Sequence, residues 1–337
     1  MKYVAVLLAL LFSPGLLPVV QAQQVPIQTD LNGDGKVNGR DIFFYSAHWG
    51  SNIVPQYEWN PLRRDFLLQM IQDWHKTSDR RINPYTQQEE WIIPLAALAQ
   101  NAHPLTMVKI PAGTFTMGSD LPNTDIIEEW RKHPVTINRA FFIGKFEVTQ
   151  AQWLAVMGDN PSTNQNNSNQ PVESISWEEC QEFINRLNES EQSPLRFRLP
   201  TEQEWEYACR AGTSTEYSHG SGETCTPPEV RPTDPCSEHI AFMWYAGNNS
   251  ISPRSAGTKL PNPWGLYDMH GNVNEYCQDI YITPLTQVQY PNERVVRGGS
   301  FASPDWNCRS AARSAQPVNA GSITIGFRLA ADVIEDS

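Results

Sequence analysis

The chain has 337 residues, a formal net charge of −12 and a pI near 5.1. This length accommodates two ordinary domains, or one large domain with appendages. Hydrophobic residues make up 40% of the chain and eleven residues are Trp, which is enough material for a sizeable core. The acidic balance, with no basic face to neutralise phosphates, argues against a nucleic-acid partner.

The N-terminus has the pattern of a secretory signal peptide over residues 1–22. Lys2 supplies a positive charge, residues 4–12 form an unbroken apolar run, and Val20-Gln21-Ala22 has the small-residue cleavage pattern. The alternative is a membrane anchor, but the run is too short to span a bilayer and residues 13–15 (SPG) interrupt it. We therefore expect a mature protein that is secreted or periplasmic, with no membrane span after signal cleavage.

We expect the cysteines of an exported protein to form disulfides, because such bonds persist outside the reducing cytosol. Cys225 and Cys236 bracket a Pro-rich loop, and a disulfide between them would stabilise the fold by roughly 2–3 kcal/mol. The other four cysteines allow three connectivities, among which the sequence does not choose; they are Cys180, Cys209, Cys277 and Cys308.

A calcium-binding loop is predicted at residues 30–41, after a short linker. Six residues occupy the ligand positions of an EF-hand loop: Asp30, Asn32, Asp34, Lys36 through its carbonyl, Asn38 and Asp41. Gly35 permits the sharp turn, and Asp at the last position followed by an apolar helix start resembles a dockerin repeat over residues 23–55. The alternative is a polar turn without metal. A single repeat is present, whereas dockerins pair two.

Residues 56–104 are expected to form a helical connector. Asn60 is placed to cap a helix over 60–77, in which Leu62, Phe66, Met70 and Trp74 recur every four residues. Farther along, capping boxes predict three helix starts, at Thr149 with Gln152, Ser176 with Glu179, and Thr201 with Glu204. Glu202 and Glu206, beside the last of these, are expected on a solvated face.

Ordered motifs from residue 107 to 332 resemble the formylglycine-generating enzyme, or sulfatase-modifying factor, family. The motifs are IPAGTFTMGS (110–119), EVTQ (147–150), RLPTEQEWEYA (198–208), NPWGLYDMHGNV (262–273), RGGSF (297–301), CRSAAR (308–313) and GFR (326–328). The resemblance implies an α+β, C-type-lectin-like domain over residues 105–333, with little regular secondary structure.

The resemblance also implies a calcium site. Its ligands here would be the side chains of Asp268 and Glu275 and the backbone carbonyls of Gly271 and Val273. Such oxygen donors suit calcium. The alternative is a capping turn in which the two acidic residues satisfy backbone donors.

The family's reaction uses two cysteines that bind copper(I) and activate oxygen to convert a substrate cysteine to formylglycine. In this sequence Ser300 falls on the serine of the family's Gly-Gly-Ser, and Ser303 falls on the first cysteine. The second cysteine has no counterpart in this sequence. Cys308 is the only nearby thiol, and it could equally form a disulfide with Cys209. A serine hydroxyl is a poor copper(I) ligand, so copper is not expected.

The sequence therefore favours a divergent, calcium-stabilised binding or structural module over an enzyme. Residues expected along a binding groove are Asn274, which replaces a family Trp, and Asp305, Trp306, Arg309 and Arg313. Trp306 would stack on a sugar or aromatic group and the arginines would bind a carboxylate or sulfate; alternatively, Trp306 is core and Arg313 pairs with a buried acid. An extracellular protein or carbohydrate is the expected ligand. The other hypotheses are a formylglycine-generating oxidase, and a partner-docking role for residues 30–50.

Overall fold

The computed structural model describes residues 80–83, 85–95, 97–120, 129–190, 194–221, 237–249 and 251–334. The chain divides into two compact units, Met1–Tyr57 and Glu58–Ser337, and every described residue belongs to the second. The signal peptide, the calcium loop, the helix over 60–77 and the Cys225–Cys236 bridge lie outside the described residues and stay predictions.

The described residues form short strands and a few short helices. The strands are β1 (Arg80–Ile82), β2 (Glu89–Ile93), β3 (Leu105–Ile110), β4 (Gly113–Met117), β5 (His133–Ile137), β6 (Phe141–Gly144), β7 (Leu195–Arg198), β8 (Asn274–Ile282), β9 (Gln289–Arg297), β10 (Arg313–Pro317), β11 (Ile325–Gly326) and β12 (Ala330–Val333). The helices are α4 (Gln150–Met157), α5 (Trp177–Ser190), α6 (Glu202–Arg210), α7 (Ser237–Ile240) and the 3-10 helix η1 (Asp305–Cys308). The prediction of an α+β fold is confirmed.

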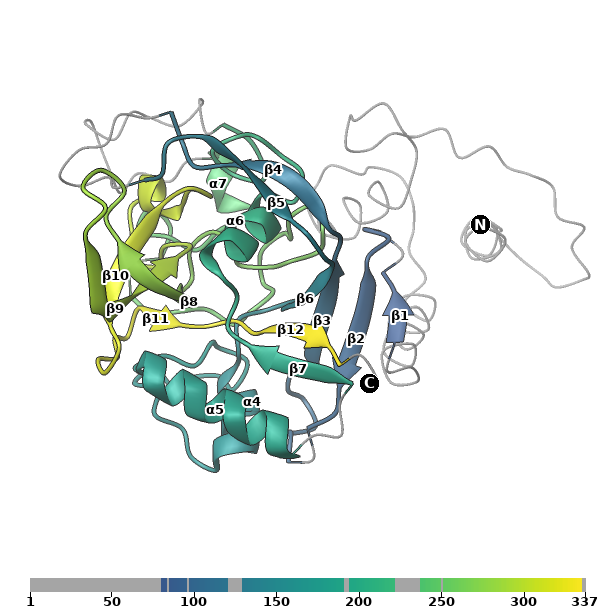
Figure 1. The fold of residues 1–337 in the computed structure, drawn as a ribbon. Coiled ribbons are helices and arrows are strands. Elements are labelled where there is room, and N and C mark those ends of the chain that lie inside the picture. The colour runs from purple at the N-terminus through teal and green to yellow at the C-terminus, as the bar shows by residue number, and fades with distance from the viewer. Residues whose placement is uncertain are drawn as a thin grey trace, which may run out of the picture. The chain divides into compact units, whose positions relative to one another are not determined.

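A six-stranded antiparallel sheet, in the order β1-β2-β3-β6-β12-β7, lies at the centre of this unit (Figure 1). Alternate residues of its strands enter two different hydrophobic clusters. On one face Met107 and Phe142 pack with Trp153 of α4 and Phe183 of α5. On the other face Val108 and its neighbours pack against α6, the β4–β5 hairpin and β9. The period of two residues along each strand thus places helices on both faces.

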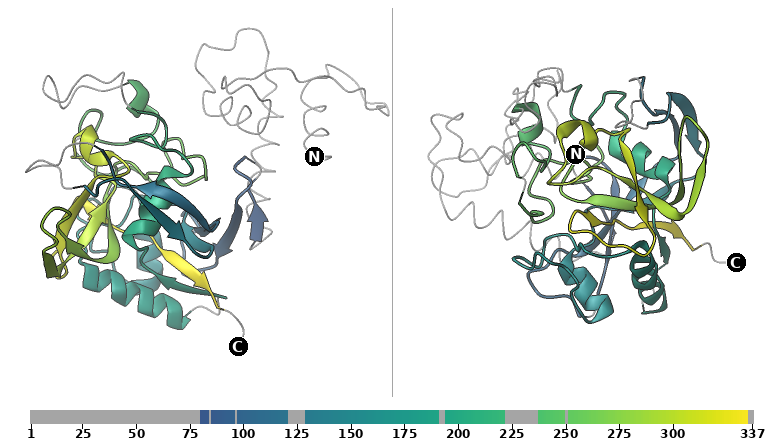
Figure 2. Two further views of the ribbon diagram at one scale, coloured as in Figure 1. Left: turned by 45° about the horizontal axis from the view of Figure 1, so that its top comes forward. Right: turned by 90° about the vertical axis from the view of Figure 1, so that its left-hand side faces the viewer.

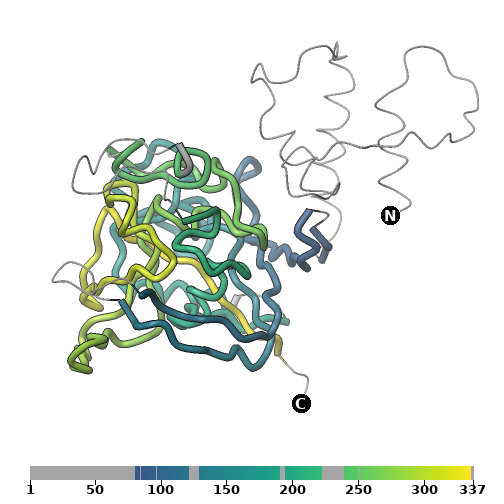
Figure 3. Tube along the Cα trace, turned by 90° about the horizontal axis from the view of Figure 1, so that it is seen from above, coloured from purple at the N-terminus to yellow at the C-terminus, as the bar shows by residue number. Residues whose placement is uncertain are grey.

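A second, four-stranded sheet (β10-β9-β8-β11) carries the C-terminal motifs. The chain then crosses from β11, which pairs in parallel with β8, to β12 in the central sheet, beside β7 (Figure 2). Seen from above, the yellow C-terminal loops lie on the side of the unit away from the dark blue β1 (Figure 3).

Strands β1 and β2 occupy part of the stretch that the sequence pattern assigned to a helical connector. Trp91 and Ile93 are buried in the core cluster shared with α4 and α5. Glu90, the residue before Trp91, is buried on the opposite face and forms ion pairs with Arg81 (2.7 Å) and Lys145 (2.8 Å). Arg81 lies nine positions from Glu90 and Lys145 lies 55 positions from it, and neither spacing marks a buried ion pair in the sequence.

All three predicted capping boxes are confirmed. Thr149, Ser176 and Thr201 each accept a hydrogen bond from the backbone N–H three residues later, and that residue's side chain accepts from the backbone N–H of the cap. Each box fixes the start of a helix, namely α4, α5 or α6.

The expectation that Glu202 and Glu206 lie on a solvated face is wrong. Both are buried, and both form ion pairs with the buried Arg297. Glu206 also pairs with Arg210, one helical turn away, at 2.8 Å. Among the described residues, no helix is both long and apolar enough to cross a bilayer.

Candidate functional site

The RGGSF segment makes a tight turn after β9, directly against η1. Gly298 and Gly299 have φ values of 92° and 71°, which favour glycine. A Cβ atom on Gly299 would lie 2.6 Å from the Cys308 Sγ atom, so no larger residue fits. The backbone of the turn therefore packs directly against the Cys308 thiol.

The hydroxyls of Ser300 and Ser303 are bonded to each other at this turn. Their Oγ atoms are 3.0 Å apart, and the backbone N–H of Ser300 donates to the Ser303 Oγ at 3.0 Å. The Ser303 carbonyl in turn accepts from the N–H of Ala246. The residue that falls on the family's first cysteine therefore holds the turn together.

Cys308 is fully buried and its thiol points at the Pro304 carbonyl, 3.6 Å away. Burial raises the pKa of this thiol far above its usual range. Cys209 lies elsewhere, with its Sγ 3.7 Å from the Nε2 of His270 and 3.7 Å from the Oγ of Ser310. All four described cysteines are free thiols, so the alternative of a Cys209–Cys308 disulfide is wrong.

These residues do not fit a copper(I) site of the family type. Such a site needs two thiolates. The segment offers two mutually bonded hydroxyls and one buried, protonated thiol.

The predicted calcium ligands Asp268, Gly271, Val273 and Glu275 lie between the two sheets, around the start of β8. Asp268 has a φ of 56° and accepts from the Gly257 N–H through Oδ2 at 2.7 Å. Its other oxygen, Oδ1, is buried without a hydrogen-bond partner. Burial raises the pKa of this carboxyl. A buried carboxylate oxygen without a hydrogen-bond partner is available to coordinate a cation.

Glu275 fits the same site less well. Its two oxygens accept three bonds of 2.6 Å, two from the Arg328 guanidinium and one from the Trp205 Nε1. Arg328 also donates to the carbonyls of Gly144 and Tyr267. A third buried carboxylate, Glu147, accepts from the Val273 N–H and has a raised pKa because of burial. Of these three buried carboxyl groups, Asp268 is thus the one with an oxygen that accepts no hydrogen bond.

The two predicted groove arginines are engaged inside the protein. Arg309 pairs with Glu129 at 2.6 Å and donates to the Trp306 carbonyl at 2.7 Å. Arg313 pairs with Glu202 at 2.7 Å, and its guanidinium lies against the rings of Trp130 and Tyr281. Neither guanidinium is presented to a ligand.

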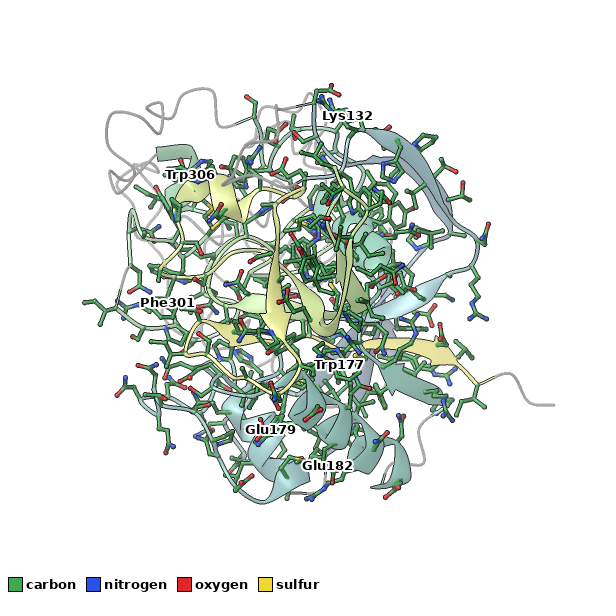
Figure 4. All side chains as sticks on the ribbon, turned by 60° about the vertical axis from the view of Figure 1, so that its left-hand side comes forward. Lys132, Trp177, Glu179, Glu182, Phe301 and Trp306 are labelled. Atoms are coloured by element: carbon green, nitrogen blue, oxygen red, sulfur yellow. The ribbon has the colours of Figure 1, made fainter. Side chains whose placement is uncertain are left out.

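The remaining groove residues fall in two places. Asp305 and Trp306 are half-buried in η1, and Trp306 is marked in Figure 4 together with Phe301 of the preceding turn. Asn274 instead begins β8, against β11, where its Nδ2 donates to the Thr324 carbonyl at 3.3 Å.

Three histidines far apart in the sequence meet beside η1, which sequence spacing did not indicate. The ring centroid of His219 lies 5.3 Å from that of His239 and 5.4 Å from that of His270. His270 accepts from the Ser218 N–H through Nε2 (3.1 Å), and its Nδ1 lies 2.7 Å from the Cys308 carbonyl. Since a carbonyl only accepts, His270 is a neutral Nδ1–H tautomer that ties the 217–220 loop to η1.

Comparison with known proteins agrees with this architecture. Residues 95–333 match the model of the sulfatase-modifying factor enzyme 1-like domain. The chain is 27% identical to the formylglycine-generating enzyme of Mus musculus, over 67% of this chain and 75% of that one. It is 30% identical to the chaperone protein LppX of Paenibacillus barcinonensis, over 48% and 70%.

A solved structure is similar along most of the described unit. Treponema denticola variable protein 1 superposes with a TM-score of 0.57 and 27% identity, covering 72% of this chain and 98% of that one. A family match over more than two-thirds of the chain, carried by the same motifs that build the two sheets, shows that this protein belongs to the sulfatase-modifying factor family.

Proposed function

We propose that this protein is an exported, catalytically divergent member of the family that works as a calcium-stabilised recognition or structural module. The observation that carries this proposal is the Ser300–Ser303 pair beside a buried Cys308. A serine hydroxyl does not replace a thiolate toward copper(I), and the remaining thiol is protonated and faces a carbonyl.

The relatives include formylglycine-generating enzymes and also proteins with other names, so a role other than oxidation is compatible with the family. One similar protein is a chaperone and another a variable protein, so related chains include proteins that are not named as formylglycine-generating enzymes. Function on a shared fold resides in the site and not in the architecture. We propose an extracellular protein or a carbohydrate as the ligand, with the half-buried Trp306 as the aromatic contact.

Calcium is proposed at Asp268 as a stabilising ion. Three buried carboxyl groups (Glu147, Asp268 and Glu275) surround one buried guanidinium, Arg328, so ionising all three leaves an excess of negative charge. The orphaned Oδ1 of Asp268 and backbone carbonyls would hold the ion, and its charge would offset that excess. The EF-hand-like loop at residues 30–41 is a second proposed calcium site, and docking of a partner there stays a prediction.

The alternative function is a formylglycine-generating oxidase. The test is to incubate copper-loaded protein and oxygen with a peptide that carries a Cys-x-Pro-x-Arg motif, and to follow aldehyde formation by mass. We expect no aldehyde. Aldehyde that disappears in Cys308→Ala, but not in the matched buried-thiol control Cys180→Ala, would overturn the proposal.

A further inference from the structure

The nitrogens of His219 and His239 face each other beside η1. The Nε2 atom of His219 lies 3.0 Å from the Nδ1 atom of His239. Aromatic packing holds both rings: His219 stacks on Phe242 with an interplanar angle of 2°, and the His239 ring lies 4.3 Å from that of Tyr217. The nitrogen pair is therefore positioned by its surroundings and not only by its own hydrogen bond.

Asp305 lies behind this pair. Its Oδ2 is 3.8 Å from the Nε2 of His239, on the side of the ring opposite to His219. This separation is longer than a hydrogen bond, so the carboxylate acts on the imidazole through its charge. A carboxylate on the far side of the ring also stands behind many metal-binding histidines, where it raises the basicity of the ligand. His239 is fully buried, so the orientation is not averaged by solvent.

We infer that His219 and His239 form a binding site for a divalent transition metal ion of the zinc class, with Asp305 as the outer partner of His239. Zinc–nitrogen bonds of about 2.0–2.1 Å in a tetrahedral site separate two ligand nitrogens by about 3.3 Å. To exchange its shared proton for the ion, the pair has to open by a few tenths of an ångström. The two rings also have to turn, because lone pairs that face each other in a hydrogen bond converge at an angle on a tetrahedral ion. Imidazole suits zinc, copper and nickel, whereas calcium prefers oxygen.

The site has two protein ligands among the described residues. His270 is excluded as a third, because its two nitrogens are committed to Ser218 and Cys308. No group of three His, Cys, Asp or Glu side chains in the described part of the chain is arranged to hold a metal. Water or a bound ligand fills the other positions, as in an open metal site.

The two rings differ in what lies behind them. The Nδ1 of His219 is buried without a hydrogen-bond partner, so this ring lacks the outer support that Asp305 gives His239. His239 is therefore the stronger of the two ligands.

The test uses the full mature chain, stripped with EDTA and titrated with Zn²⁺ by calorimetry, with Co²⁺ absorption as a second probe. We expect one ion per chain with nitrogen coordination, loss of this binding in His219→Ala and His239→Ala, and a 10–100-fold weaker affinity in Asp305→Asn. His133→Ala is the matched control, since His133 lies outside the cluster and its Nδ1 contacts the Arg131 carbonyl.

Absent Zn²⁺ binding, or binding equally tight in His219→Ala and the unmodified chain, overturns the inference. Near-UV circular dichroism checks the fold of each variant. If His239→Ala does not fold, the half-buried His219 and Asp305 variants decide the question. Asp268→Asn should retain Zn²⁺ binding, which separates this site from the proposed calcium site.

Discussion

At the scale of single residues, the fold depends on charges buried in matched sets. Arg328 and Glu275 are both fully buried and bonded through two pairs of atoms. Truncating one partner of a buried ion pair leaves the other charge uncompensated in a medium of low polarity.

Glu275→Ala or Arg328→Ala alone should therefore lower the free energy of unfolding by about 3–5 kcal/mol. The joint change to apolar residues, Glu275→Leu with Arg328→Met, should cost less than the sum of the two single changes, because the two paired charges are removed together. Urea unfolding of the four proteins measures this, and strictly additive losses would contradict it.

Gly299 provides a second prediction at the scale of one residue, namely that the turn does not tolerate a side chain there. Gly299→Ala places a methyl group against the Cys308 Sγ and the Asn307 carbonyl oxygen, at a φ of 71°. Gly158→Ala is the matched control, because it also has a positive φ (88°) but has nothing within 4 Å. We expect the control to cost about 1 kcal/mol, from backbone strain alone, and Gly299→Ala to cost clearly more. Equal melting temperatures would show that the turn relaxes without cost.

At the scale of elements, His270 connects the loop after α6 to η1. Burial lowers its pKa to about 4, whereas an unfolded histidine titrates near 6.5. Above pH 6.5 neither state binds the proton, and as the pH falls toward 4 only the unfolded chain takes it up. The stability of the fold should thus decline over this window, by up to about 3 kcal/mol.

His270→Gln removes this titration and should flatten the pH profile between 6.5 and 4. Its amide can still accept from the Ser218 N–H, so the loop keeps its tether. Thermal unfolding at a series of pH values measures the difference between the two proteins. An equally steep profile in the variant would assign the acid sensitivity to other groups, such as the half-buried His219.

The same scale shows which features the sequence predicts. The capping boxes at Thr149, Ser176 and Thr201 were readable because each is complete within four residues. The burial of Glu202 and Glu206 was not readable, because their partner Arg297 lies about ninety residues away. The same holds for the histidine cluster, since His219 and His270 are 51 positions apart and meet only through the loop contacts around Ser218. Ordered motifs gave the family and the α+β fold, but not the partners of the buried charges.

At the scale of the whole molecule, the proposed calcium ion would hold together the region between the two sheets. Added Ca²⁺ should raise the melting temperature of the EDTA-treated protein by several degrees, since ligand at a hundred times its dissociation constant adds about 2.7 kcal/mol. Asp268→Asn should abolish the shift, whereas Asp30→Ala with Asp34→Ala should leave it in place. A shift that survives Asp268→Asn would place the stabilising ion elsewhere.

The position of β12 has a consequence for how this protein is made. This strand contains residues 330–333, yet it lies between β6 and β7 in the central sheet, and β7 joins that sheet only through it. A chain emerging from a ribosome or an export channel presents β7 more than 130 residues before its hydrogen-bonding partner arrives. Until then the edges of β6 and β7 are open to other chains. Residues 330–333, which follow β7 by more than 130 positions, are thus the ones that close the sheet.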